Sequence, residues 1–161
     1  MEYQIQPTPS MRTAKSVSST EIAGKWTPVF GCASPGDLSV SYTTQTGYYT
    51  RQGTLLILHS TLEIVPTFTT ASGDLAITGL PFYGDTFTDN VGFMRFTGGT
   101  ITPPTNTIQI TPMQVSNLDG IKFVCMGASA IDLFLEIGDI TSGSTFVIVL
   151  TMLSRLLDPN R

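Results

Sequence analysis

The sequence predicts an all-β fold, an antiparallel β-sandwich of jelly-roll type with an extended N-terminal arm. Its 161 residues fit one domain, which at this size can bury a core without disulfides or metals. The polar residues are mainly hydroxyls, 25 Thr and 14 Ser, beside 15 Gly and 10 Pro. Thr suits strands, and the other three suit turns. Apolar residues come in short runs, and no helical period holds over a dozen residues.

The N-terminal segment differs from the rest of the chain. Residues 1–25 are rich in Pro and Ser and contain few large apolar groups. Such a segment cannot bury enough surface to offset its ordering entropy, so we expect a flexible arm that orders only on a partner. The β-sandwich is then expected to span residues 26–161, with Trp26 buried at the junction.

Strand-like runs follow one another through the body, separated by turn residues. The predicted strands are 38–42, 47–52, 54–65, 73–78, 91–97, 107–113, 120–126, 130–137 and 144–153. The segment TTQTG (43–47), which ends at Gly47, is predicted to be a turn, and Gly53 a bend or bulge. Irregular connections between so many strands favour a jelly roll over a meander barrel.

Two of these runs are apolar on both faces. In 54–65 and in 144–153, both alternating sets of positions carry large apolar residues. One face of such a strand packs in the sandwich, and the other requires a second cover. Charged residues make up only 12% of the chain, which agrees with a surface hidden against copies of itself. The predicted subunit interface consists of Leu55, Ile57, His59, Val147 and Val149.

Charge and composition argue against several classes of partner. The net charge is −4, with +1 on residues 1–25 and −5 on the remainder, so the body lacks the basic face of a nucleic-acid-binding protein. The apolar stretch 146–157 is interrupted by polar residues, and a spanning helix needs ~20 apolar ones, so no membrane partner is expected. The first ten residues do not resemble a signal peptide, which predicts synthesis in a cytoplasm.

Few residues suggest chemistry. His59 is the only histidine, and no nucleophile elbow surrounds a serine, so we expect neither an enzyme nor a catalytic residue. Cys32 and Cys125 lack zinc-ligand spacing and are expected to pack as small apolar side chains. Asp85 and Asp89 could ligate calcium or act as paired carboxylates, but turn chemistry in a solvated loop is the favoured interpretation. No cofactor or metal is expected.

Three segments of the body carry a resemblance. The run WTPVFG (26–31), the spacing YxxQxGxYxRxG from Tyr42 to Gly53, and SGDLAITGLPF (72–82) are similar to β-sandwich modules of tailed-phage virion proteins. These modules occur in head decoration (cement) proteins and at tail-fibre tips, and they are commonly trimeric jelly rolls. The resemblance covers residues 26–82 and implies a homotrimer in a virion, without assigning any binding residue.

These observations together predict a decoration protein that binds the major capsid protein as a homotrimer on the capsid surface, after synthesis in the host cytoplasm. The capsid-contacting residues of the arm are predicted to be Ile5, Met11, Arg12, Lys15 and Val17. The alternative is a tail-fibre or spike tip that binds a host receptor or glycan. A fibre tip is expected to follow a shaft repeat, which these 161 residues do not contain, so decoration is preferred.

Overall fold

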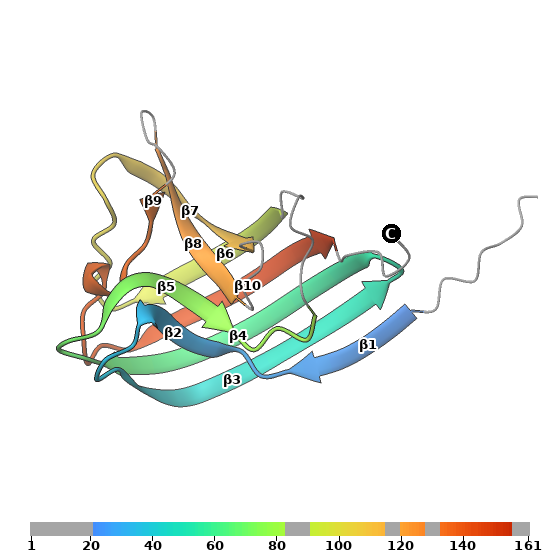
Figure 1. Ribbon diagram of the computed structural model, residues 1–161, viewed down its shortest axis with the longest axis horizontal. Helices are drawn as coiled ribbons and strands as arrows, with labels where there is room; N and C mark the ends of the chain where they lie inside the picture. Colours follow the sequence, from blue (N-terminus) through green and yellow to red (C-terminus); the bar gives the residue numbers. More distant parts are fainter. Residues whose placement is uncertain (1–20, 83–90, 115–119, 128–132, 156–161) are drawn as a thin grey trace, which may run out of the picture.

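The computed structural model describes residues 21–82, 91–114, 120–127 and 133–155. Within these ranges the chain forms ten strands and one short 3-10 helix. The strands make two antiparallel sheets that face each other, as Figure 1 shows. The predicted all-β sandwich is therefore confirmed.

The five-stranded sheet, sheet A, is the larger layer. In spatial order it contains β1 (Glu21–Trp26), β3 (Ser39–Gln52), β4 (Leu55–Thr67), β10 (Phe146–Arg155) and β6 (Val91–Gly98). Sheet B contains β2 (Val29–Ser34), β5 (Ser72–Thr78), β8 (Gly120–Gly127) and β7 (Thr107–Gln114). The short strand β9 (Leu133–Phe134) pairs with β8, and a 3-10 turn follows at Ile137–Asp139.

The connections cross between the sheets in matched pairs. Strand β4 pairs with β10 in sheet A. In sheet B, β5, which follows β4, pairs with β8, which precedes β10 with the short β9 and the 3-10 turn between them. In the same way β6 pairs with β10 in sheet A, and β7, which follows β6, pairs with β8 in sheet B. Crossings of this kind are typical of Greek-key folds. The complete eight-strand order of a jelly roll stays a prediction.

The core lies between the sheets and follows strand alternation. Every second residue of β4 and β10 is buried, because successive side chains of a strand point to opposite faces. From sheet A these core residues are Leu56, Leu58, Leu62, Ile64, Phe146, Ile148 and Leu150. Sheet B contributes Leu75, Ile77, Ile121 and Phe123. Each such side chain contributes about 1.5–3 kcal/mol of transfer free energy.

The turn predicted at TTQTG does not exist. Strand β3 runs without interruption from Ser39 to Gln52, with one irregularity between Tyr42 and Thr44. Gly47 instead leaves room for an indole ring, since a Cβ at this position would lie 2.6 Å from Nε1 of Trp26. A missing side chain in the middle of a strand, rather than a turn, explains this glycine.

Trp26 is buried as predicted, with 7% of its surface exposed. Its Nε1–H donates toward two backbone carbonyls, those of Tyr48 and His59, each 3.3 Å away. The indole therefore ties β1 to both β3 and β4.

Gly53 is part of a hairpin loop rather than a bulge. Gln52 pairs with Leu55, so the loop between β3 and β4 has two residues, Gly53 and Thr54. Gly53 has φ +61, whereas Thr54 has no positive φ. A positive φ at the first loop residue alone is the signature of a type II′ turn, which matches strand twist.

Three segments differ from the predicted strands. Residues 21–25, expected in the flexible arm, form β1 and pair with β3 from Gln52 to Tyr48. The boundary at residue 25 is therefore wrong, because pairing with a neighbour strand orders a segment whose own composition is weakly strand-forming. Strand β2 was not predicted. Of the predicted strand 130–137 the structure describes residues 133–137: Leu133 and Phe134 form β9, Glu136 makes an isolated bridge to Asp74, and the 3-10 turn begins at Ile137.

Candidate interface on the outer face of sheet A

The five predicted interface residues lie on one surface. Leu55, Ile57 and His59 alternate with buried residues of β4 and therefore point away from sheet B. Val147 and Val149 occupy the same face of the adjacent β10, where they pair with Glu63 and Thr61. We call this surface, with the residues of β1, β3 and β6 that continue it, the outer face of sheet A.

Three further large side chains on this face were not predicted. Tyr48 is 49% exposed, Phe93 is 72% exposed and Leu153 is 45% exposed. Leu153 pairs with Ile57, and one cross-strand row runs through the whole sheet. That row consists of Lys25, Tyr48, His59, Thr151 and Phe93. Alternation in β6 and β10 indicates which face of its own strand Phe93 or Leu153 occupies. Only the strand order shows that these faces continue the outer face of β4.

Several large apolar side chains of this face lie in water. Leu55 and Ile57 are 40% and 43% exposed, in addition to the three residues above. Together the five side chains present on the order of 500 Å² of apolar surface. The largest apolar patch of a typical monomer is about 300–600 Å² and is often functional, so this face is a candidate contact surface.

Polar groups lie among and around the apolar ones. Nδ1 of His59 is 3.0 Å from Oγ1 of Thr151, so the imidazole has a hydrogen-bond partner within the sheet. The Lys25 ammonium lies 5.9 Å from the centre of the Tyr48 ring. Glu63 and Arg95, which pair with Val147 and Val149, add one charge of each sign. Polar and apolar side chains are therefore mixed on this face, as they are over a whole protein interface.

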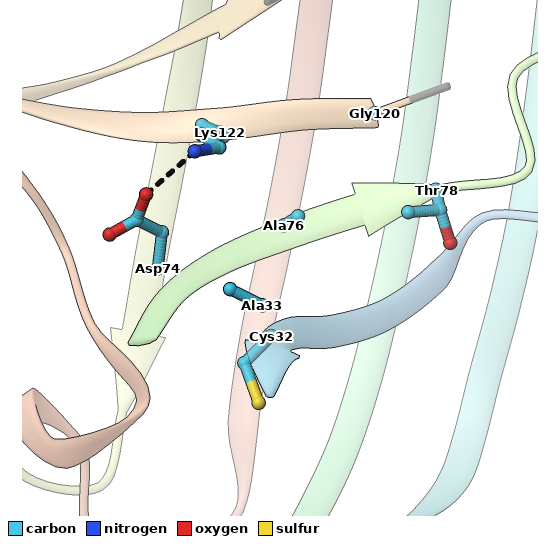
Figure 2. A pocket seen from close by; sticks show the side chains of 7 residues that line it. All are labelled: Cys32, Ala33, Asp74, Ala76, Thr78, Gly120 and Lys122. Atoms are coloured by element: carbon cyan, nitrogen blue, oxygen red, sulfur yellow. Dashed lines mark hydrogen bonds and ion pairs between the residues drawn. The ribbon is translucent and has the colours of Figure 1, made fainter. Parts of the chain in front are cut away.

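The outer face of sheet B has a different character. A hollow of about 410 Å³ there is lined by Cys32, Ala33, Asp74, Ala76, Thr78, Gly120 and Lys122. Figure 2 shows Lys122 reaching Asp74, with Nζ 2.6 Å from Oδ2. The same ammonium lies 4.5 Å from the centre of the Phe134 ring. The two charges in the hollow therefore satisfy each other.

The thiols show no sign of a nucleophilic role. Burial raises the pKa of Cys32, at the rim of the hollow, above its ordinary value. Burial is also the main cause that raises the pKa of Cys125, which is packed in the core. Both thiols stay protonated at neutral pH, whereas a nucleophile needs the thiolate.

Other predicted site residues cannot be placed. Ile5, Met11, Arg12, Lys15 and Val17 of the arm lie outside the described residues, as do Asp85 and Asp89. The capsid contacts and the ion-binding interpretation therefore stay predictions. In the described part of the chain no three His, Cys, Asp or Glu side chains form a group that could hold a metal ion. No helix in that part is long and apolar enough to cross a membrane.

Comparison with known proteins gives a fold likeness and no family. No protein-family model and no curated protein matches the chain. The crystal structure of the Dettilon tailspike protein (gp208) is similar over 84% of this chain, with a TM-score of 0.51 and 16% sequence identity. The likeness covers 24% of the tailspike chain, so the chain spans about a quarter of that protein's length. At this identity the likeness shows the fold alone.

Proposed function

We propose that the protein is a structural component of a phage virion that assembles as a homotrimer through the outer face of sheet A. The observation that carries the proposal is the apolar outer face of β3, β4, β10 and β6, where Phe93 alone is 72% exposed. Burying this face between copies removes it from water at about 25 cal/mol per Å². The sequence resemblance to virion modules and the fold likeness to part of a tailspike support the virion setting.

Within the virion, we assign the protein to the capsid surface as a decoration protein. In this trimer sheet B faces outward from the shared face, and we propose that residues 1–20 contact the major capsid protein. Arg12 and Lys15 give that arm its basic character, which suits an acidic surface groove. The role is structural rather than catalytic.

A tail-spike or fibre-tip module is the second candidate. The fold likeness to part of the Dettilon tailspike protein favours it. In that setting the trimer belongs to a longer fibre, and its free surfaces contact a receptor or glycan on the host. The hollow beside Asp74 and Lys122 carries hydrogen-bonding groups of the kind that such a ligand needs.

Two measurements test the proposal. Light scattering of the purified protein should give three times the chain mass of 17.3 kDa. A stable monomer at micromolar concentration contradicts self-assembly. The labelled trimer is then incubated with empty capsids assembled from the virus's own major capsid protein, and separately with host cells. Saturable binding to capsids alone supports decoration, and saturable binding to cells alone supports the spike tip.

A further inference from the structure

The free edges of the two sheets are built differently. Each edge strand of sheet B pairs in an irregular register: a shift falls between Cys32 and Ser34 in the β2–β5 pair, where the extra residue lies on β5, and between Thr107 and Gln109 in the β7–β8 pair, where it lies on β7. Strand β7 also contains Pro112. Bulges and prolines are the usual means of keeping an edge from pairing with another chain.

The edges of sheet A lack these features. Strand β1 pairs with β3 in unbroken register from Glu21 to Trp26, and β6 pairs with β10 in unbroken register from Val91 to Gly98. Neither strand contains proline. In β6 the one charged residue is Arg95, and within the described residues the far edge of β6 has no strand partner. A regular, mainly apolar edge is a template for another strand.

A hollow opens beside β6 as well. It measures about 380 Å³ and is lined by Met94, Phe96, Pro103, Thr107, Ile108, Gln109 and Ile110. Ile108 is 76% exposed. A strand added to the edge of β6 covers apolar side chains in this lining, such as Ile108, so side-chain burial reinforces backbone pairing there.

The direction of the strands allows copies to join in a ring. Each pair in the order β1-β3-β4-β10-β6 is antiparallel, so β1 and β6, at opposite edges of sheet A, run in the same direction (Figure 1). A rotation axis parallel to the strands therefore brings β6 of one copy beside β1 of the next as a parallel pair. Such a contact joins two different edges, and a ring of such contacts closes.

The width of sheet A selects the number of copies. Five strands spaced about 4.8 Å apart span about 19 Å. Strands on either side of a 60° corner must also lie about 4.8 Å apart, so each corner adds about 4.8 Å and the side measures about 29 Å. The centre of that triangle lies about 8 Å from each sheet, a distance that large side chains such as Phe93 and Tyr48 can fill from three sides. A square leaves about 13 Å, too far for side chains to fill. Three copies fit.

We propose that three copies join edge to edge, β6 of one beside β1 of the next, so that their A sheets form a closed triangular prism. The outer face of each sheet A points to the three-fold axis, where Ile57, His59 and Leu153 from the three copies meet. The proposal rests on the self-assembly proposed above and specifies its geometry. A second copy of this chain is the occupant of the β6 edge.

Rotation without translation also sets the register at the junction. The row that contains Lys25 at one edge of sheet A contains Phe93 at the other. In a closed ring the row of one copy continues in the next, so the Lys25 ammonium of one copy lies beside the Phe93 ring of its neighbour. A cation near an aromatic ring at this range is attractive. Phe93, 72% exposed in one copy, is thereby covered.

A charge pair placed across the junction tests the proposal. Phe93→Lys places two ammonium groups opposite each other, and like charges directly opposite destabilise a strand pair. We expect its mass by light scattering to fall from three times 17.3 kDa to 17.3 kDa. Adding Lys25→Glu to the same chain should restore the trimer mass, while Lys25→Glu alone is the matched control. Melting curves of all three variants establish that each is folded.

The outcomes separate the two proposals. If the wild-type chain is a trimer and Phe93→Lys is monomeric, restoration by Lys25→Glu supports the β6–β1 junction. If the double variant stays monomeric, β6 pairs with something other than β1, such as β6 of a second copy, and the prism is overturned. If Phe93→Lys remains a trimer, the junction is overturned while assembly through the outer face stands. A monomeric wild type overturns both.

Discussion

The two sheets of the sandwich share one core but present opposite surfaces. Sheet A has regular edges and leaves large side chains such as Phe93 and Ile57 in water. In sheet B both edge strands pair in an irregular register, and the outer face carries a hollow lined mostly by small residues. Charges on sheet B are paired within the chain, as between Asp74 and Lys122.

The two sheets differ in how far their exposed groups are satisfied within one chain. Sheet B satisfies its ion pair within the chain, although side chains such as Ile108 and Met126 are exposed on it. Sheet A has regular edges and several large apolar side chains exposed on its outer face, and we propose that another chain covers them.

The largest effect is expected from Trp26, which holds the edge strand of sheet A. Trp26→Ala leaves a cavity beside Gly47 and removes the indole donor to two carbonyls. Loss of a buried Trp costs about 3–5 kcal/mol, which lowers Tm by about 10 °C for a domain of this size. Thermal unfolding measures the shift. Ile108→Ala, which removes a side chain that is 76% exposed on sheet B, is the control and should change Tm little. Equal melting of both variants refutes the anchoring role.

A matched pair of lysines compares the two outer faces directly. Ile57 on sheet A is 43% exposed and Met126 on sheet B is 46% exposed, so neither substitution by Lys disturbs the core. Ile57→Lys should weaken the trimer by at least a hundredfold, about 2.7 kcal/mol, because it buries an unpaired charge at the interface. Met126→Lys should leave the trimer unchanged. Sedimentation at several concentrations measures both, and equal behaviour of the two variants removes the distinction between the faces.

Two truncations locate the end of the arm. Deletion of residues 1–20 leaves β1 intact, so folding and assembly should persist while capsid binding weakens at least about tenfold, or ~1.4 kcal/mol. Deletion of residues 1–24 also removes most of the β1–β3 pairing. Each lost backbone hydrogen bond costs ~0.5–1.5 kcal/mol, so Tm should fall by several degrees. Identical melting of the two truncations would show that β1 does not contribute to the stability of sheet A.

The smallest effect concerns Asp37, which holds the connection from sheet A to sheet B. Its carboxylate accepts hydrogen bonds from the backbone N–H groups of Thr69, Thr70 and Ala71. These bonds lower the pKa of Asp37 well below its ordinary value of about 3.9. A lowered folded-state pKa contributes stability above the unfolded-state pKa, and this contribution is lost as the pH falls further.

We therefore expect Asp37→Asn to flatten the acid branch of the stability curve. Urea unfolding from pH 7 down to pH 2 measures it, and the variant should lose less stability below pH about 4 than the wild type does. Glu21, an exposed carboxylate on β1, offers the control through Glu21→Gln. The same acid dependence in the wild type and in Asp37→Asn would show that the carboxylate does not act through these bonds.

Part of the candidate site could be predicted and part could not. Alternation in 54–65 and 144–153 was enough to place Leu55, Ile57, His59, Val147 and Val149 on one outward face, because side-chain direction in a strand is a local property. Tyr48 and Phe93 escaped prediction. Their neighbours on the face come from strands far away in the sequence, and no local pattern specifies that order.

Taken alone, the sequence determined the all-β class, the buried Trp26 and the two-sided apolar character of β4 and β10. These features depend on composition and on a period of two residues. The tertiary structure decided that β1 belongs to the sheet, that Gly47 accommodates an indole, and that sheet A keeps regular edges while sheet B has irregular ones. Each of these depends on which distant strand lies alongside, because hydrogen-bond pairing and side-chain contact between strands are set by the fold rather than by neighbouring residues.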